Sequence, residues 1–485
     1  MVPIHIERIL FHFQNSQDQV VLGIGDQKYT YGELNSRVQS IALGLRNIEE
    51  KRIGLFLESS VEAYASIVAC WLMGKSYVIL PPKYPFERIQ KIIHQGDIRT
   101  IIGLRSALPD EFEKLELSFL DLEKLNAFEK DFNFSTSMEL DEAYVLFTSG
   151  TTGEPKGVPI SHANLANFVA AFLDLGYDLN HEDRFLQMFE LTFDLSIMSY
   201  LIPMVLGASF YLINQQKIKS IAIYEVLEIQ EITFALMVPS VVKTMEPYLK
   251  DEILGKVKYT QFCGEALMTS QVKSWQKICP NSDIDNVYGP TEATIYCTRY
   301  RVPRGLPIKN WNGLVCIGQP MFGTDLCIMN EELLIGGAQV THGYLKVPRE
   351  NQPFEVIQET SYYRTGDLAT KVDSDFYCLG RLDRQVKIQG FRVELSEIEY
   401  AFQKLFPEHE AVVLFFRQDV QEKLILCILD PKNKRTEIEI FNQLKAVLPS
   451  YMIPQQIRKF ENWLLNSNGK IDRKQLENEF LHSKG

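Results

Sequence analysis

Short apolar runs alternate with longer amphipathic segments through most of the chain. Residues 52–58 (RIGLFLE) predict a strand, residues 60–74 (SVEAYASIVACWLMG) a helix, and residues 76–82 (SYVILPP) the next strand. Strands that alternate with helical patterns of about 10–15 residues indicate parallel sheets covered by helices on both faces. Further runs that predict strands of this kind lie at residues 99–104, 144–150, 184–189, 209–213, 232–239, 258–264 and 283–289.

The spacing of the predicted strands changes beyond residue 310. Short runs separated by turn residues favour an antiparallel sheet or a small barrel, and they lie at residues 316–321, 325–330, 332–337, 376–383 and 385–392. From about residue 384 the pattern predicts, in order, an amphipathic helix, two paired strands and a second helix, at residues 394–406, 411–418, 424–430 and 436–454. The fold class expected is therefore α/β: a large N-terminal part of parallel sheets with helices and a small barrel-like β subdomain, then a small α+β C-terminal domain.

Composition and charge exclude several classes of protein. A chain of 485 residues is too long for one ordinary core. Its net charge of −12 argues against a nucleic-acid binder, which would carry a basic domain or stripe. The eight cysteines show no CxxC spacing and the eight histidines are scattered, so neither a zinc site nor a disulfide framework is predicted. Reduced thiols in the cytoplasm are the simpler interpretation.

One uncharged segment, residues 195–216, requires comparison with a transmembrane helix. It contains Ser196, Ser199, Pro203 and Gly207, which a membrane span of this length would not favour. The pattern indicates a buried helix, a Pro/Gly break and then a strand. The N-terminus also lacks the shape of a signal peptide. We therefore expect no direct insertion into a membrane.

Glycines, hydroxyls and a lysine gather in residues 146–157 (LFTSGTTGEPKG). Glycines allow close approach of the backbone, hydroxyls and amides donate hydrogen bonds, and Lys156 adds positive charge. This composition predicts an anion site, although a solvated turn after a strand remains the alternative. The spacing of Gly150 and Gly153 differs from that of a Walker A loop.

Two further stretches supply what a nucleotide site needs. In NVYGPTEAT (286–294), Tyr288 offers a ring, Thr291 a hydroxyl for phosphate and Glu292 a carboxylate for Mg²⁺. A turn with a buried tyrosine is the alternative. In YRTGDLA (363–369), the carboxylate of Asp367 follows a turn, where it can accept hydrogen bonds from two ribose hydroxyls.

Taken together, these stretches resemble the adenylate-forming superfamily, specifically amino-acid adenylation domains and D-alanine–carrier-protein ligases. The resemblance covers nearly the whole chain, and the motifs occur in the family's order. They are YTYGEL, SYVILPPKYPFERI, LFTSGTTGEPKG, FDLSIMS, YGPTEAT, ELLIGGAQVTHGYL, YRTGDLA, GRLDRQVKIQGFRVE, LPSYMIP and NGKIDR.

The resemblance implies an enzyme that makes an acyl-adenylate from a carboxylate and ATP with Mg²⁺, and then passes the acyl group to a thiol. It implies an adenylation core at residues 1–382 and a mobile C-terminal domain at residues 383–485. Residues that match the phosphate loop are Thr148, Ser149, Gly150, Thr151, Thr152, Gly153 and Lys156. Residues that match the rest of the nucleotide site are Gly264, Glu265, Asn286 and Tyr288 (adenine), Thr291 (α-phosphate), Glu292 (Mg²⁺), and Asp367 and Arg381 (ribose).

Two more matches concern the reaction itself. Lys470 matches the catalytic lysine, whose ammonium offsets the repulsion between the attacking carboxylate and the α-phosphate. Asp383 matches the hinge about which the C-terminal domain turns after adenylation.

Asp194 matches the aspartate that pairs with the α-ammonium group of an amino acid, with a helix N-cap as the alternative. Cys263 resembles the small thiol side chain of the D-alanine ligases, so D-alanine is the first expectation. Leu236, Val287 and Tyr296 are bulkier or more apolar than such a ligase predicts, so another small or apolar amino acid stays open. Tyr296 is expected either to shrink the pocket or to bond a polar substrate. By the family's positions, the side-chain pocket is lined by Leu195, Met198, Leu236, Cys263, Val287, Ile295 and Tyr296.

The thiol acceptor expected is the phosphopantetheine group of a separate carrier protein, or free coenzyme A, because the chain ends without room for a fused carrier. An acyl-CoA synthetase is the alternative enzyme, and Asp194 argues against it because a buried unpaired carboxylate is costly. A non-catalytic nucleotide-binding relative is the third interpretation. Lys156, Glu292, Asp367 and Lys470 argue against it, because each charged role has a candidate residue.

Overall fold

The computed structural model describes residues 2–125, 141–150, 154–246, 249, 253–388, 390–418, 421–430, 435–464 and 471–482. The chain divides into two compact units. The first unit consists of Met1–Pro82, Ile92–Phe147 and Gly157–Asp383, and the second of Lys83–Lys91, Thr148–Lys156 and Arg384–Gly485. The predicted phosphate loop thus clusters with the C-terminal part of the chain. Among the described residues no helix is long and apolar enough to cross a membrane.

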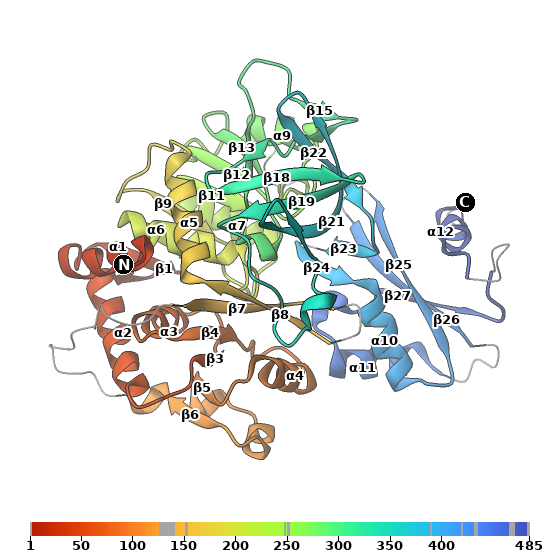
Figure 1. The fold of residues 1–485 in the computed structure, drawn as a ribbon, viewed down its shortest axis with the longest axis horizontal. Coiled ribbons are helices and arrows are strands. Elements are labelled where there is room, and N and C mark those ends of the chain that lie inside the picture. Colours follow the sequence, from red (N-terminus) through yellow and green to blue (C-terminus); the bar gives the residue numbers. More distant parts are fainter. Residues whose placement is uncertain are drawn as a thin grey trace. The chain divides into compact units, whose positions relative to one another are not determined.

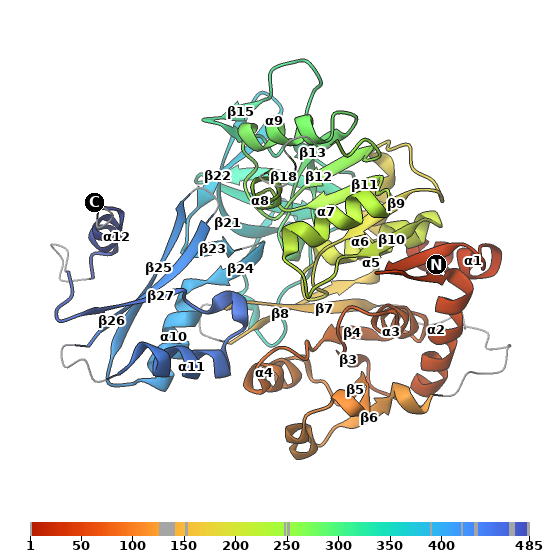
Figure 2. The ribbon, with the colours of Figure 1, turned by 180° about the vertical axis from the view of Figure 1, so that it is seen from behind.

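A nine-stranded sheet forms the centre of the first unit, and six neighbouring strands in its middle are parallel and mostly buried. Burial on both faces explains why these strands are continuous apolar runs in the sequence. Helices α7, α8 and α9 lie over the face seen in Figure 2. The order is β17 (Gln319–Pro320), β14 (Thr298–Arg301), β13 (Asp283–Tyr288), β12 (Tyr259–Phe262), β11 (Phe234–Met237), β9 (Arg184–Gln187), β10 (Ser209–Leu212), β1 (Val20–Ile24) and β2 (Gln27–Thr30). The helices are α7 (Lys219–Ile229), α8 (Ser240–Met245) and α9 (Thr269–Ile278).

The uncharged segment forms the expected buried helix, break and strand. Helix α6 (Leu195–Leu206) contains Pro203 and ends at Gly207, whose φ of 74° is left-handed. A side chain at Gly207 would collide with the ring of His12, with 2.5 Å from its Cβ to Cε1. Glycine is therefore required at this position both by the backbone conformation and by space. Strand β10 follows directly.

A second sheet of six strands lies in the N-terminal part of the chain, and five of its strands pair in parallel. Helix α2 (Tyr31–Leu45) begins with a capping box between Thr30 and Glu33. The strand order is β6 (Ser118–Asp121), β5 (Thr100–Gly103), β3 (Arg52–Phe56), β4 (Ser76–Ile79), β7 (Glu142–Thr148) and β8 (Lys156–Ser161). Other helices of this part are α1 (Ile4–Asn15), α3 (Val61–Leu72), α4 (Phe86–Gly96) and α5 (His162–Asp174), and Figure 1 labels them all.

The change of pattern beyond residue 310 corresponds to an antiparallel sheet of five strands, which confirms that expectation. Leu333, Ile335, Tyr363 and Phe376 form part of its small core. The strands are β18 (Thr324–Met329), β19 (Glu332–Gly337), β21 (Thr360–Val372), β20 (Phe354–Ile357) and β22 (Asp375–Arg381). A two-stranded ribbon precedes it, β15 (Asn310–Trp311) with β16 (Leu314–Val315). Short 3-10 turns lie at Arg105–Ala107, Asp110–Lys114, Leu122–Lys124, Thr291–Ala293 (η5), Arg349–Asn351 and Ser450–Met452.

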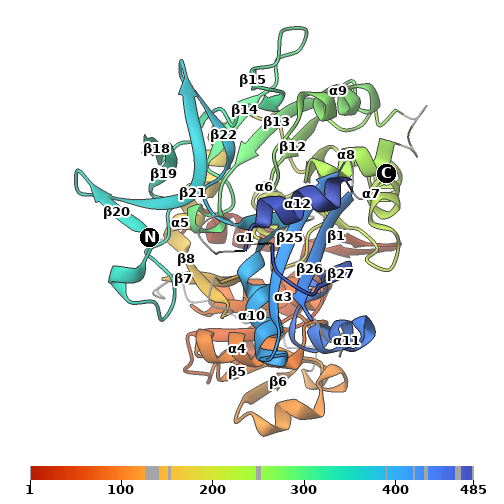
Figure 3. The same cartoon turned by 90° about the vertical axis from the view of Figure 1, so that its right-hand side faces the viewer.

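The second unit is an α+β unit, as expected, and its sheet is covered on both faces. Val413 and Leu426 share a core with Phe402 of helix α10, whereas Val412 and Ile425 share one with Leu476 of helix α12. Successive residues of a strand point to opposite faces, so these strands read as continuous apolar runs. Figure 3 shows β25, β26 and β27 with these helices. The elements are β23 (Gln385–Ile388), β24 (Phe391–Glu394), α10 (Leu395–Leu405), β25 (Glu410–Gln418), β26 (Gln421–Leu429), α11 (Glu437–Val447), β27 (Gln456–Phe460) and α12 (Arg473–His482).

Candidate active site

Four of the predicted site residues form one chain of hydrogen bonds in the first unit. The hydroxyl of Tyr288 donates to Asp367 Oδ2 over 2.5 Å, and Arg381 donates to Asp367 Oδ1 over 2.9 Å. Arg381 also donates to both carboxylate oxygens of Asp383, over 2.9 and 2.5 Å. The residues predicted for adenine, ribose and hinge are therefore physically connected, although they come from β13, β21, β22 and the turn after β22.

Burial fixes the protonation state of Tyr288. Burial raises the pKa of Tyr288 well above its usual value, and the neighbouring Asp367 carboxylate raises it further. The tyrosine is therefore a neutral donor at any physiological pH. A charge-assisted bond from a neutral donor to a buried carboxylate is stronger than one between neutral groups. Asp367 is thus held in one orientation by a phenol on one side and a guanidinium on the other.

The other residues predicted to contact adenine are also engaged. The side-chain amide of Asn286 donates to the carbonyl oxygens of Cys316 and Val315, over 2.9 and 3.4 Å. The carboxylate of Glu265 accepts from the backbone N–H and the hydroxyl of Ser240, each over 3.0 Å, and so caps helix α8. Gly264 has a left-handed φ of 85° just after β12. These side chains hold the framework of the predicted adenine site.

Glu292 lies in the turn η5 and is fully buried. Its Oε1 accepts a hydrogen bond of 2.5 Å from the hydroxyl of Tyr344. Thr291, predicted to contact the α-phosphate, begins the same turn and is half-buried. Tyr344 was not among the predicted site residues, although it belongs to the motif ELLIGGAQVTHGYL.

The donor set around Glu292 fits a magnesium ion that arrives with a nucleotide. Mg²⁺ prefers oxygen ligands and commonly binds through one or two carboxylates, with phosphate and water in the other positions. In the part of the chain that the structure describes, no group of three or more His, Cys, Asp or Glu residues could hold a metal. Glu292 would supply one such carboxylate, and it lies next to Thr291, the predicted phosphate contact.

The residues predicted for the amino-acid pocket are all buried in the first unit. Asp194 is 4% exposed and stands at the N-cap position of α6, yet its side chain makes no capping hydrogen bond to that helix within the described residues. The start of α6 lies beside the end of β12, since a Cβ on Gly264 would be 3.6 Å from Leu195 Cδ1. The remaining residues are at most 2% exposed: Leu195, Met198, Leu236, Cys263, Val287, Ile295 and Tyr296.

The hydroxyl of Tyr296 is held by hydrogen bonds among residues that the sequence analysis did not identify as site residues. Its hydroxyl donates to Gln261 Oε1 over 2.8 Å, and Gln261 Nε2 donates to the hydroxyl of Tyr177 over 2.8 Å. Tyr177 in turn donates to Asp285 Oδ2, a fully buried carboxylate that Arg301 also holds. The phenol proton of Tyr296 is therefore used in a hydrogen bond within the protein. The phenol oxygen can still accept a hydrogen bond, so both expectations for Tyr296, a smaller pocket or a bond to a polar substrate, stay predictions.

In the second unit the phosphate-loop residues are held by the C-terminal part of the chain. Ser149 Oγ donates to the carbonyl oxygen of Arg392 over 2.8 Å and accepts from the N–H of Glu394 over 3.1 Å. The N–H of Gly150 lies 3.3 Å from Glu397 Oε2, and Arg88 donates to Glu397 Oε1 over 2.5 Å. Both members of that ion pair are nearly inaccessible to solvent.

Glycine is needed at position 150 because a Cβ there would collide with the carbonyl oxygen of Glu154. Lys156 begins strand β8 and is half-buried, and Thr148 ends β7. Four predicted residues lie outside the described residues: Thr151, Thr152, Gly153 and Lys470.

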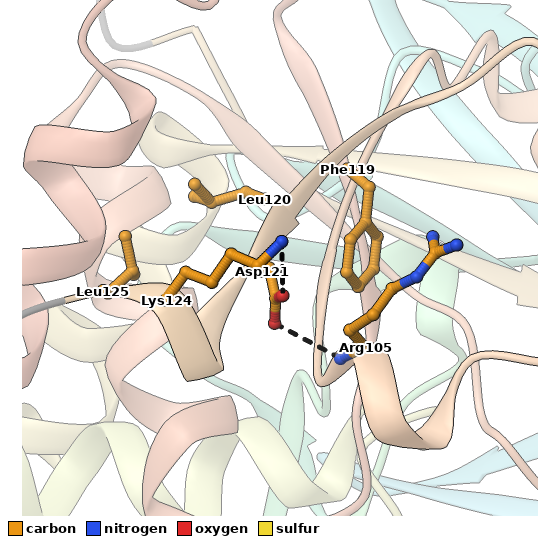
Figure 4. Close-up of a pocket in the computed structure, with 6 residues that line it drawn as sticks. All are labelled: Arg105, Phe119, Leu120, Asp121, Lys124 and Leu125. Carbon is orange, nitrogen blue, oxygen red and sulfur yellow. Dashed lines mark hydrogen bonds and ion pairs between the residues drawn. The ribbon is translucent and has the colours of Figure 1, made fainter.

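A separate hollow of about 390 Å³ lies at the ends of β5 and β6 and is lined by none of the predicted site residues (Figure 4). Its one buried carboxylate, Asp121, accepts from the N–H of Arg105 over 3.3 Å and lies 3.7 Å from Lys124 Nζ. The charge in this hollow is therefore already compensated within the chain.

Comparison with known proteins shows which sequences and structures the chain is similar to. The sequence pattern of the family described as AMP-binding enzyme matches residues 12–345. The chain is 31% identical over 488 residues to tyrocidine synthase 1 of Brevibacillus parabrevis, covering 95% of this chain but 43% of that protein. The chain thus spans less than half the length of this synthase. It is 29% identical over 501 residues to the D-alanine--D-alanyl carrier protein ligase of Bacillus licheniformis, covering 98% of this chain and 99% of that protein.

Among solved structures, the fold is similar to the crystal structure of the Vibrio cholerae adenylation domain AlmE in complex with glycyl-adenosine-5'-phosphate. The TM-score is 0.84 at 24% sequence identity, covering 98% of this chain and 97% of that chain. At this identity the likeness concerns the fold, and it confirms the expected fold class.

Proposed function

The chain belongs to the family of AMP-binding enzymes, and on that premise we propose that it activates an amino acid as aminoacyl-AMP, with release of pyrophosphate. The aminoacyl group then passes to the phosphopantetheine thiol of a separate carrier protein. D-alanine is the proposed substrate. The reaction is proposed to take place in the cytoplasm, where ATP is available and the eight free cysteines would stay reduced.

The observation that carries the proposal is the buried carboxylate of Asp194 at the start of α6. A cation placed beside a carboxylate that has left water offsets part of the cost of its burial. The α-ammonium group of an amino acid is such a cation, whereas a simple carboxylic acid has none. Asp194 also stands at the start of α6, which contributes Leu195 and Met198 to the pocket. The same helix would thus recognise both the amino group and the side chain.

A held aromatic ring at the proposed pocket favours a substrate with a small side chain. The ring of Tyr296 is fully buried and packs against Phe168, with the ring centroids 5.0 Å apart. Its hydroxyl is bonded to Gln261, so the ring cannot swing away without breaking that bond. An apolar pocket limited by a held aromatic ring suits the methyl group of alanine. The full-length similarity to a D-alanine--D-alanyl carrier protein ligase supports the same substrate and a separate carrier protein.

For the nucleotide we propose that Tyr288 and Asn286 position adenine and that Asp367 accepts hydrogen bonds from the ribose hydroxyls. Arg381 would hold Asp367 for that task, since it already donates to one of its oxygens. Glu292 would hold Mg²⁺, and the ion would offset the negative charge of the phosphates. Tyr344 would orient Glu292 through the hydrogen bond to its Oε1.

Adenylation brings two anions together, because the substrate carboxylate attacks the α-phosphorus. We propose that the ammonium group of Lys470, outside the described residues, offsets this repulsion, and that Thr291 donates to the α-phosphate. Residues 148–156 would hold the β- and γ-phosphates until pyrophosphate leaves. We also propose residues 1–382 as the adenylation core and 383–485 as the mobile domain, with Asp383 as the hinge.

The test is ATP–pyrophosphate exchange against a panel of D- and L-amino acids and simple carboxylic acids. D-alanine should give the highest exchange. An Asp194→Asn variant keeps the shape of the side chain and should lose about 100-fold in kcat/KM for the amino acid, since a buried charge pair is broken. A larger amino acid as the best substrate would refute D-alanine. Exchange that needs no amino group would refute the role of Asp194 and favour an acyl-CoA synthetase.

A further inference from the structure

The loop that carries the predicted Mg²⁺ ligand and part of the pocket has an unusual backbone. Two consecutive residues that are not glycine, Thr294 and Ile295, have φ values of 56° and 75°. A left-handed conformation is disfavoured for a β-branched side chain, because its branched Cβ crowds the backbone. Such a conformation persists only when the surrounding structure holds it.

One residue, Gln339, contacts this loop with both its side chain and its backbone. Its side-chain Nε2 is 3.3 Å from the carbonyl oxygen of Ala293, 3.4 Å from that of Thr294 and 2.9 Å from that of Tyr296. Its backbone carbonyl oxygen accepts a 2.5 Å bond from the hydroxyl of Thr294. Gln339 is fully buried, so water does not compete for these bonds.

Further hydrogen bonds hold Gln339 and its two neighbours in the sequence. The amide of Asn164 in helix α5 donates to the carbonyl oxygens of Ala338 and Val340, over 2.7 and 3.1 Å. The side-chain oxygen of Gln339, Oε1, accepts from Thr324 Oγ1 over 3.3 Å. Hydrogen bonds therefore connect helix α5 to residues 338–340, and Gln339 to the loop.

We propose that Gln339 is a positioning residue that sets the amino-acid pocket by holding Thr294 and Ile295 in the left-handed conformation. This proposal rests on the function proposed above. Ile295 and Tyr296 line the proposed pocket, and the Tyr296 carbonyl is the nearest partner of the Gln339 amide. Without that amide, the loop relaxes toward ordinary backbone angles and the two side chains leave their places. Glu292 is less affected, because its carbonyl is held separately by the N–H of Thr341 over 2.8 Å.

The experiment uses the full-length protein with Gln339→Met, which keeps the length of the side chain but removes the donor, and the milder Gln339→Asn. Kinetics of ATP–pyrophosphate exchange are measured with the amino acid that the wild type prefers. The expected result is a loss of about 100-fold in kcat/KM for the amino acid, expressed as a rise in its KM, with the KM for ATP unchanged. A purely structural role would reduce the amount of active enzyme and leave both KM values unaltered.

Thr324→Val is the matched control. It removes a hydrogen bond to the same side chain but leaves the three bonds from Nε2 to the loop, so the KM for the amino acid should rise far less than in Gln339→Met and the KM for ATP should stay at that of the wild type. Equal KM changes in the control and in Gln339→Met would overturn the proposal.

A crystal structure of each Gln339 variant tests the proposal independently of activity. The φ angle of Ile295 should leave the left-handed region. If it stays near the wild-type value, Gln339 does not hold the loop, whatever the kinetics. If the wild type shows no exchange with any amino acid, the proposed function fails, and the crystal structures still decide the role of Gln339.

Discussion

Acid should destabilise the first unit through a pair of buried histidines. His5 Nε2 and His162 Nδ1 are 3.0 Å apart, and their rings stack with 5.2 Å between centroids. Both rings pack edge-on against Trp71. Within the described residues, the outer nitrogens His5 Nδ1 and His162 Nε2 have no hydrogen-bond partner. Protonation of this pair in the folded state would thus bury a charge that nothing compensates.

The sign and the size of the effect follow from the pKa values. Burial lowers the pKa of His162 from 6.5 to about 4, and burial together with His162 lowers that of His5. In the unfolded chain both histidines bind protons below about pH 6.5, so the unfolded state takes up more protons as the pH falls. The stabilisation is present above that pH and is lost below it. For His162 alone, the loss between about pH 7.5 and pH 5 is about 2 kcal/mol, and His5 adds to it.

The assay is urea unfolding followed by tryptophan fluorescence, to which Trp71 contributes, at about pH 7.5 and pH 5. The double variant His5→Phe, His162→Phe removes both titrating groups and keeps two aromatic rings against Trp71. It should lose at least about 2 kcal/mol less stability on acidification than the wild type. His342→Gln, which removes an exposed histidine, should behave like the wild type. Equal losses in the wild type and the double variant would refute the reasoning.

Four further predictions concern the proposed site. Asp367→Asn should raise the KM for ATP by about 10- to 100-fold in exchange kinetics, because a charge-assisted contact is lost; an unchanged KM would exclude a ribose contact. Lys470→Ala should abolish pyrophosphate exchange while ATP affinity by calorimetry stays within about threefold, and near-normal exchange would contradict its role. Asp383→Pro should leave adenylation intact but stop transfer to the carrier thiol, so normal transfer would rule out the hinge. Glu397→Gln should destabilise the second unit by about 3 kcal/mol in thermal unfolding, because Arg88 would stay buried without its partner; a wild-type melting curve would show that the pair contributes nothing.

Many strands of both units could be predicted because burial on both faces leaves continuous apolar runs, whereas β1, β6 and β27 were not predicted. Helix α6 with its break at Gly207 was predictable for the same reason, since proline and glycine mark where a buried helix ends. Helix α1 was not expected. It follows Pro3, which offers no side chain to cap the helix, so the sequence lacks a start signal there.

The residues that hold the site could not be predicted, because their partners lie far away in the sequence. Tyr344 is 52 residues from Glu292, and Gln339 is 43 residues from Tyr296. Periodicity and spacing report on neighbours within one element, whereas these contacts depend on how the sheets pack. Motifs identify residues that would touch a ligand, but a glutamine whose amide donates to backbone carbonyls far away in the sequence carries no such signal.

Tyr296 illustrates how these supporting contacts would determine what the proposed amino-acid pocket can accept. Its hydroxyl is bonded to Gln261, and its carbonyl oxygen to Gln339. The residue is therefore held at both ends, by side chains that come from β12 and from the segment after β19. A smaller side chain at position 296 would enlarge the pocket but leave the buried oxygen of Gln261 without its donor, which costs about 1–3 kcal/mol. The pocket can thus widen at low cost only if Gln261 changes as well. The hydrogen bond from Tyr296 to Gln261 both holds the ring that limits the pocket and satisfies the buried amide oxygen of Gln261.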